Sequence, residues 1–183
     1  MYRLRIFYRK EGIARFISER NFQRVIERIL RKMELPLKFT EGFSPHPKMS
    51  FGHPLPIGIA GINECFDIFL INKIDINLFL ERSREILPDG ISFISCCWVK
   101  IEAPSIHKIE TFAKYTIELT KGENIEDIRK IGKIVEHKEG KVVLEIKINN
   151  FSHRELTKLF LEHKIGNIVR EICVLSEDSQ QKI

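Results

Sequence analysis

The sequence predicts an α+β protein built from two tandem ferredoxin-like units, each with the element order βαββαβ and an antiparallel sheet. Short alternating apolar runs, typical of strands, lie beside longer stretches with helical spacing. The order strand, helix, strand, strand, helix, strand occurs twice along the 183 residues. Hydrophobic residues make up 43% and charged residues 30%, the balance of a globular protein with a solvated surface.

The first unit is expected to span residues 1–102. Its first helix follows Ser18, which has the chemistry of an N-cap, and ends before Pro36. Asp75 can cap the second helix, which Pro88 stops. The expected strands are residues 2–8, 37–40, 64–72 and 91–99.

A loop dense in glycine and proline, residues 41–61, is inserted near the second expected strand. A loop this long inside a compact domain is usually functional or disordered, and its Phe, Met and Ile content argues against disorder. We therefore expect a shaped loop with a role of its own.

The second unit is expected to span residues 109–176, after a linker at 103–108 and before a polar tail at 177–183. Isoleucines at 125, 128 and 131 mark a short helix, and Ser152–Glu155 reads as a capping box that opens a longer one. The expected strands are residues 112–120, 134–137, 142–148 and 168–175.

The charge balance favours an anionic partner, with nucleic acid first. Thirty basic residues against 25 acidic ones give a net charge of +5, although interspersed charges also suit a protein that is merely soluble. No stretch approaches the roughly 18 apolar residues of a membrane helix. The N-terminus alternates rather than carrying the apolar core of a signal peptide, so a cytoplasmic protein without a membrane partner is expected.

The four cysteines, Cys65, Cys96, Cys97 and Cys173, do not form a ligand pattern. Cys96 and Cys97 are adjacent and would point to opposite faces of a strand. No C-x-x-C occurs. We expect reduced, mostly buried thiols, no metal site and no cofactor.

The first strand predicts a basic face. With Leu4, Ile6 and Tyr8 directed toward the helices, the opposite face carries an aromatic between cations, which suits phosphate contact and base stacking. Its residues are Arg3, Arg5, Phe7 and Arg9. Two alternatives stay open: cross-strand pairing, for example of Arg5 with Asp67, and burial of this face against the other half.

A second basic surface lies on the first helix, where Arg20, Arg24, Arg28 and Arg31 follow a spacing of i, i+4, i+8 and i+11. Glu27 interrupts them and can pair with Arg31, as on an ordinary solvated face. Because Phe7 adds stacking and the loop's Lys48 adds charge near the sheet face, Arg3 and Arg5 are expected to contribute more to RNA affinity than Arg24 and Arg28.

The loop also carries His46, Lys48 and His53. Two histidines could act as acid and base on an RNA 2′-hydroxyl, with the lysine stabilising the developing charge. A binding loop without catalysis, a metal site and a rigid structural loop are the alternatives.

The first half resembles a known family at G-I-A-R-F-I-S (residues 12–18), L-P-L (35–37), E-G-F-S-P-H-P (41–47) and L-P-I-G (55–58). These motifs are similar to those of the uncharacterised bacterial domain that accompanies radical-SAM proteins, fused or separate. The resemblance implies a radical-SAM protein as partner. Domain order and charge also resemble those of tandem ferredoxin-like endoribonucleases that process CRISPR repeat RNA, but their glycine-rich loop near the end of the second unit is missing here.

We therefore expect a non-catalytic accessory module that binds RNA or a ribonucleoprotein for a radical-SAM enzyme. A metal-independent endoribonuclease using the loop histidines and a protein–protein adaptor remain as alternatives.

Overall fold

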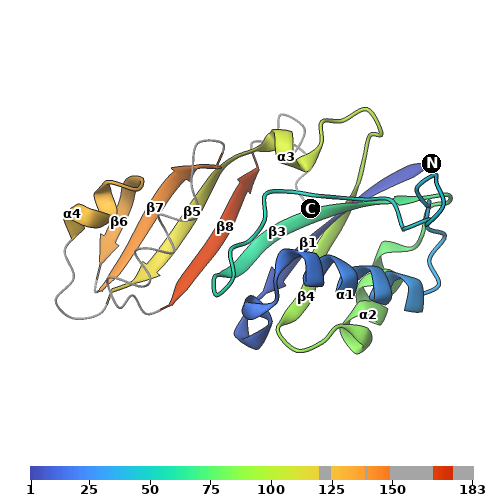
Figure 1. Cartoon of the computed structure of the whole chain (residues 1–183), viewed down its shortest axis with the longest axis horizontal. Helices are drawn as coiled ribbons and strands as arrows, with labels where there is room; N and C mark the ends of the chain where they lie inside the picture. Colours follow the sequence, from blue (N-terminus) through green and yellow to red (C-terminus); the bar gives the residue numbers. More distant parts are fainter. Residues whose placement is uncertain (120–124, 139, 149–166, 175–183) are drawn as a thin grey trace.

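The computed structural model describes residues 1–119, 125–138, 140–148 and 167–174. They form a mixed α+β fold around one eight-stranded, mostly antiparallel sheet (Figure 1). The predicted α+β class is confirmed. The capping box at Ser152–Glu155, the helix that it would open and the polar tail lie outside the described residues. No helix in the described ranges is long and apolar enough to cross a membrane.

The first half contains two helices on one face of its strands (Figure 1). Its elements are β1 (Tyr2–Lys10), a 3₁₀ turn η1 (Gly12–Phe16), α1 (Glu19–Lys32), β2 (Met49–Phe51), β3 (Ala60–Leu70), α2 (Ile76–Ile86) and β4 (Ile91–Val99). The strands pair in the order β4-β1-β3-β2, all antiparallel.

The second half contains α3 (Ile106–Ile109), β5 (Glu110–Glu118), α4 (Ile125–Arg129), β6 (Lys133–Lys138), β7 (Lys141–Lys147) and β8 (Ile168–Val174). Its strands pair in the order β8-β5-β7-β6, again antiparallel. The two halves thus repeat one strand order.

The halves share one sheet because β8 pairs with β3. This pair is parallel and short, with Ala60 opposite Val169 and Gly61 opposite Arg170. The sequence did not predict that the two sheets would be continuous.

Local signals set the helix starts. Ser18 accepts a hydrogen bond from the backbone of Asn21 at 3.4 Å, and Asp75 accepts one from Leu78 at 3.0 Å. Both predicted caps are confirmed. They satisfy donors that the first turn of a helix leaves without partners.

The second strand lies elsewhere than predicted. Leu37 and Phe39 make isolated bridges, whereas the strand proper is β2, inside the Gly/Pro-rich loop. Phe51 stacks on Phe66 of β3 at 5.2 Å between ring centroids, and Met49 packs against the same core. Packing against β3 therefore selects Met49–Phe51.

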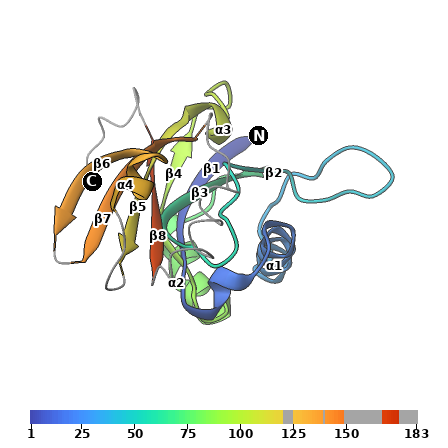
Figure 2. The same cartoon turned by 60° about the vertical axis from the view of Figure 1, so that its left-hand side comes forward.

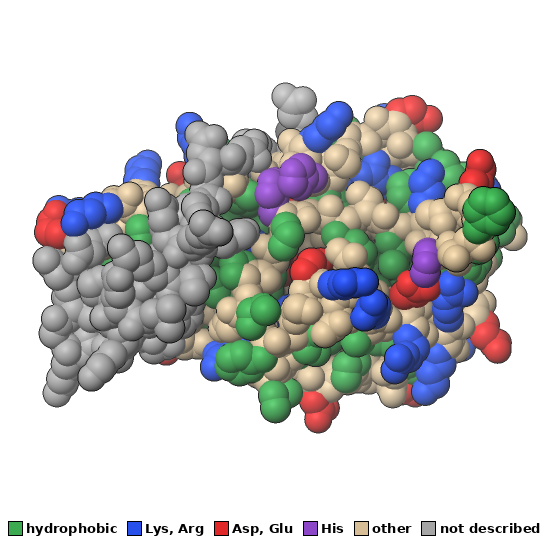
Figure 3. Space-filling view, in the orientation of Figure 1, with side chains coloured by type: hydrophobic (Ala, Val, Ile, Leu, Met, Phe, Trp, Pro, Cys, Tyr) green, Lys and Arg blue, Asp and Glu red, His purple; other side chains and the backbone are tan. Residues whose placement is uncertain are grey.

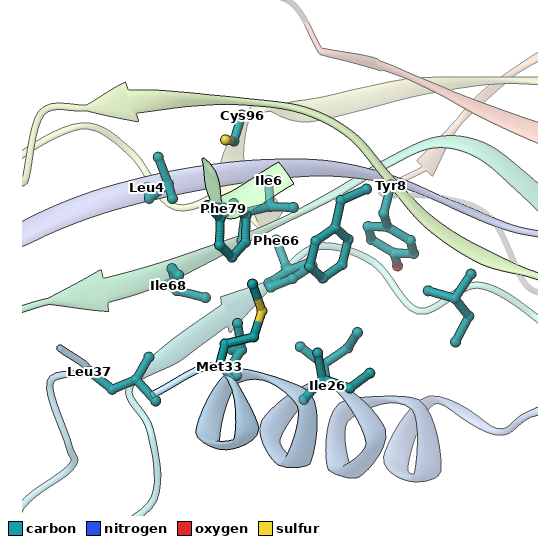
Figure 4. Close-up of a cluster of buried hydrophobic side chains, with 14 of the residues drawn as sticks. Leu4, Ile6, Tyr8, Ile26, Met33, Leu37, Phe66, Ile68, Phe79 and Cys96 are labelled. Atoms are coloured by element: carbon teal, nitrogen blue, oxygen red, sulfur yellow. The ribbon is translucent and has the colours of Figure 1, made fainter. Parts of the chain in front are cut away.

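Each half has its own core. Leu4, Ile6 and Tyr8 of β1 point toward α1, where they meet Ile26 and Met33 (Figure 4). A second cluster is formed mainly by side chains from the strands of the second half and includes Leu55 and Ile59 from the end of the Gly/Pro-rich loop. Leu55 of the loop's L-P-x-G segment and the following Ile59 thus pack into the core of the other half.

Candidate functional site

The expected basic face of β1 is not open. Arg3 and Arg5 are 4% and 8% exposed, and both donate from Nε to the buried carboxylate of Asp67 at 2.8 Å. Arg3 also donates to the carbonyl oxygens of Ala103 and Pro104 at 2.6 and 2.9 Å. The expectation that these arginines face solvent is wrong, and the alternative of cross-strand pairing with Asp67 is confirmed.

The physical reason is the register of β1 and β3, which places Arg5 directly opposite Asp67. A carboxylate without exposure needs charged partners, and two guanidinium groups supply them. Burial works to lower the pKa of Arg5, but the hydrogen bond and charge of Asp67 outweigh it and raise that pKa. Elsewhere on this face, Phe7 is half-buried and Arg9 is exposed.

The helix surface is open, by contrast. Arg20, Arg24 and Arg28 are all exposed on α1. Within the part of the chain that the structure describes, none of the three makes an ion pair or side-chain hydrogen bond. We call these three residues the α1 ridge. Lys and Arg side chains lie over the region of α1 in the space-filling view, with carboxylates between them (Figure 3).

The next arginine on this helix is engaged. Arg31 donates to Glu27 at 2.9 Å, and His46 Nδ1 lies 3.3 Å from the same carboxylate oxygen. Burial works to raise the pKa of Glu27, but hydrogen bonds with Arg31 and His46 outweigh it and hold that pKa below its usual value. The predicted Glu27–Arg31 pair is confirmed, and it also anchors the Gly/Pro-rich loop to α1.

The two loop histidines are bound to different carboxylates. His46 is exposed beside Glu27, whereas His53 is 12% exposed in its side chain and lies 3.0 Å from Glu110 through Nδ1. Lys48 is exposed, with its ammonium 5.0 Å from the centre of the Phe69 ring. The carboxylates that the two histidines contact lie on different elements, Glu27 on α1 and Glu110 on β5.

His53 instead belongs to a polar network at the junction of the halves. Glu110, at the start of β5, accepts from the backbone of His53 at 2.6 Å and contacts its ring. The His53 ring stacks on that of His107, with 3.7 Å between centroids. A carboxylate on one ring nitrogen fixes the orientation of an imidazole, which suits positioning as well as proton transfer.

The same network contains a buried ion pair. Arg170 of β8 donates to Glu64 of β3 and also to the carbonyl oxygens of His53 and Pro54, at 2.9 and 3.0 Å. Arg170 therefore ties the second half to the part of the Gly/Pro-rich loop that follows β2. Among the described residues, no group of three or more His, Cys, Asp or Glu side chains could hold a metal ion.

Sequence reasoning missed Glu64, His107, Glu110 and Arg170. The available signal was a charged residue inside an apolar strand, as for Arg170 in I-V-R-E-I. That signal indicates a buried partner but does not identify it, because Glu64 lies 106 residues away.

Adjacent Cys96 and Cys97 do lie on opposite faces of β4, as predicted. Cys96 is buried in the core with the helices, and Cys97 is exposed. Burial raises the pKa of Cys96 to about 12 and that of Cys65 further, which disfavours the reactive thiolate at both positions.

Comparison with known proteins identifies a family for the chain. No curated protein matches the chain. The model of the family described as "uncharacterized protein conserved in bacteria (DUF2344)" matches residues 3–181, which is nearly the whole chain. The chain therefore belongs to this bacterial family.

Proposed function

We propose that this protein is a cytoplasmic, non-catalytic module that binds RNA or a ribonucleoprotein, and that it does so for a radical-SAM enzyme. The observation that carries the proposal is the α1 ridge. Arg20, Arg24 and Arg28 present three guanidinium groups on consecutive turns of one helix face. Guanidinium groups bind phosphates through paired hydrogen bonds, and successive turns of a helix space them along a backbone.

The buried arginines strengthen the choice of this surface. Arg3 and Arg5 are both paired with Asp67, so the β1 face lacks the two exposed cations that phosphate binding there would need. Lys32 is a further exposed cation in the last turn of α1. A cluster of exposed cations raises the local concentration of a polyanion and speeds its association.

The fold is also consistent with this role. We interpret the repeated strand orders β4-β1-β3-β2 and β8-β5-β7-β6 as two ferredoxin-like units whose sheets have joined. In this arrangement helices cover one sheet face and leave their outer surfaces to partners. The radical-SAM partnership rests on the resemblance carried by the E-G-F-S-P-H-P and L-P-I-G segments.

The test uses purified protein, mixed RNA and EDTA. Binding at low salt without cleavage is the expected result. Cleavage that is lost in His46→Ala or His53→Ala would instead favour a metal-independent endoribonuclease. Absence of RNA binding at low salt would contradict the proposal and leave a protein–protein adaptor.

The partnership has its own test. Affinity capture of the tagged protein from its native bacterium should recover a radical-SAM protein, identified by mass spectrometry. Recovery of RNA with no radical-SAM protein would refute the partnership while leaving RNA binding intact.

A further inference from the structure

A narrow finger projects from the first half between α1 and β2 (Figure 2). We define the finger as residues 38–48. Its two arms are tied together by backbone hydrogen bonds from Lys48 to Lys38 at 2.7 Å and from Thr40 to His46 at 2.8 Å. Phe39 and Pro47 form a bridge between the arms. The finger is therefore held in shape by its own backbone hydrogen bonds, and its turn lies at residues 41–45.

Phe43 lies in that turn, and its relative exposure of 110% is the largest among the exposed apolar side chains of the described residues. The preceding Gly42 has φ 134°, a conformation that favours glycine, and nothing lies near the position of its missing Cβ. The backbone thus holds Phe43 out into solvent. Burial of a phenylalanine side chain is favourable, and the folded chain leaves this one exposed.

The root of the finger is fixed to the helix that carries the α1 ridge. Arg31 donates to the carbonyl oxygen of Pro45 at 3.4 Å and lies over the Phe39 ring at 4.9 Å. His46 contacts Glu27. These contacts tie the finger that carries Phe43 to the helix that carries the α1 ridge.

We propose that Phe43 is a stacking platform for an unpaired base of single-stranded RNA whose phosphates lie along the α1 ridge. The inference rests on the proposed RNA binding and narrows its substrate class. A single-stranded nucleic acid is bound by cations along its backbone and by aromatic rings under its bases. Bases inside a duplex are already stacked and paired, so they cannot use this ring.

The surroundings of Phe43 favour a base over a protein pocket. Of its exposed neighbours Glu41, Gly42, Ser44 and Pro45, only Pro45 is apolar. Protein-docking surfaces have several apolar side chains at their centre. An exposed ring on a loop that is tied to a helix with exposed arginines has instead the composition of a single-strand binding site.

The experiment measures fluorescence anisotropy with a labelled 12-nucleotide RNA and with the duplex of the same sequence. Phe43→Ala should lower affinity for the single strand by about 5- to 100-fold. It should leave the slope of log affinity against log salt unchanged, because no charge is lost. Phe43→Trp should retain binding. Phe16→Ala is the matched control, because it removes another exposed phenylalanine, on η1.

A strand of abasic nucleotides separates stacking from charge, and the parent and Phe43→Ala should bind it equally. The inference is overturned if Phe43→Ala binds the single strand like the parent, or if it weakens duplex binding equally. It is also overturned if Phe43→Ala loses capture of a protein partner but no RNA affinity. The proposed function survives each of these results, whereas a parent protein that binds no RNA removes both.

Discussion

Arg170 of β8 and Glu64 of β3 form a buried ion pair across the junction of the two halves, with nitrogen–oxygen distances of 2.9 and 2.6 Å. Their side chains are 0% and 3% exposed. Burial works to lower the pKa of Arg170, but the charge and hydrogen bonds of Glu64 outweigh it and raise that pKa. The pair holds the junction together because both side chains are buried, so neither charged group can exchange its partner for solvating water.

Glu64→Gln should therefore destabilise the fold strongly. The change keeps the shape of the side chain but leaves Arg170 buried without its counter-charge, which costs about 3–5 kcal/mol of unfolding free energy. Urea unfolding measures the effect. Glu136→Gln is the control, since Glu136 pairs with Lys138 at the surface, and it should cause no measurable change. A Glu64→Gln protein as stable as the parent would show that the pair does not hold the junction.

Stability should also depend on the protonation of Glu110. Burial is the main cause that raises the pKa of Glu110 to about 7, a hydrogen bond from the His53 backbone opposes it, and the charge of Glu64 adds to it. The unfolded carboxyl has a pKa of about 4.3. Between these two values the folded state binds a proton that the unfolded state has lost, so stability must fall as pH rises through this window and level off above it.

The measurement compares the parent with Glu110→Gln in urea at pH 5, 6, 7 and 8. At 1.36 kcal/mol per pKa unit, the whole window is worth about 4 kcal/mol, and the parent should lose about 2–3 kcal/mol of this relative to the variant between pH 5 and pH 8. The raised pKa of Glu110 would be contradicted if the difference in unfolding free energy between parent and variant stayed constant with pH. It would also be contradicted if the parent became the more stable of the two as pH rises.

Asp67→Asn should act on folding and not on RNA affinity. The change leaves Arg3 and Arg5 buried beside a neutral amide, which should cost about 3–5 kcal/mol. Thermal unfolding and RNA binding are measured on the same sample, with Asp89→Asn at an exposed position as control. If an Arg3→Ala, Arg5→Ala protein folds as stably as the parent yet loses RNA binding, the site belongs on the sheet face after all.

Local features of this fold could be predicted from the sequence. Ser18 and Asp75 cap their helices through contacts three residues away, which sequence shows directly. The turn at Gly140 between β6 and β7 is equally local, since its φ of 75° favours glycine. By contrast, β2 is a short strand inside a Gly/Pro-rich loop, selected by packing of Phe51 on Phe66.

The candidate site was harder to predict because it depends on which charged side chains form ion pairs in the folded protein and which stay exposed. Strand alternation alone placed Arg5 on the face away from the helices, and Asp67 was foreseen as an alternative partner from the neighbouring strand. Helical spacing placed Arg24 and Arg28 correctly on an outer face. The network around Arg170 could not be foreseen, because it arises where β3 and β8 meet and no local pattern encodes that contact.

If the α1 ridge binds RNA phosphates, RNA affinity must depend on salt through these arginines, and this dependence can be measured directly. Affinity for the 12-nucleotide RNA is measured by anisotropy over a range of salt for the parent and for Arg24→Ala, Arg28→Ala. Arg82→Ala, Arg84→Ala removes the same charge from exposed positions on α2 and serves as control.

The ridge variant should bind more weakly, and the magnitude of its slope of log affinity against log salt should fall by about 1.4, the value for two single-strand phosphates. The α2 variant should keep the slope of the parent. A ridge variant with the affinity and slope of the parent, or an α2 variant that loses as much, would contradict the claim that this helix face is the binding surface.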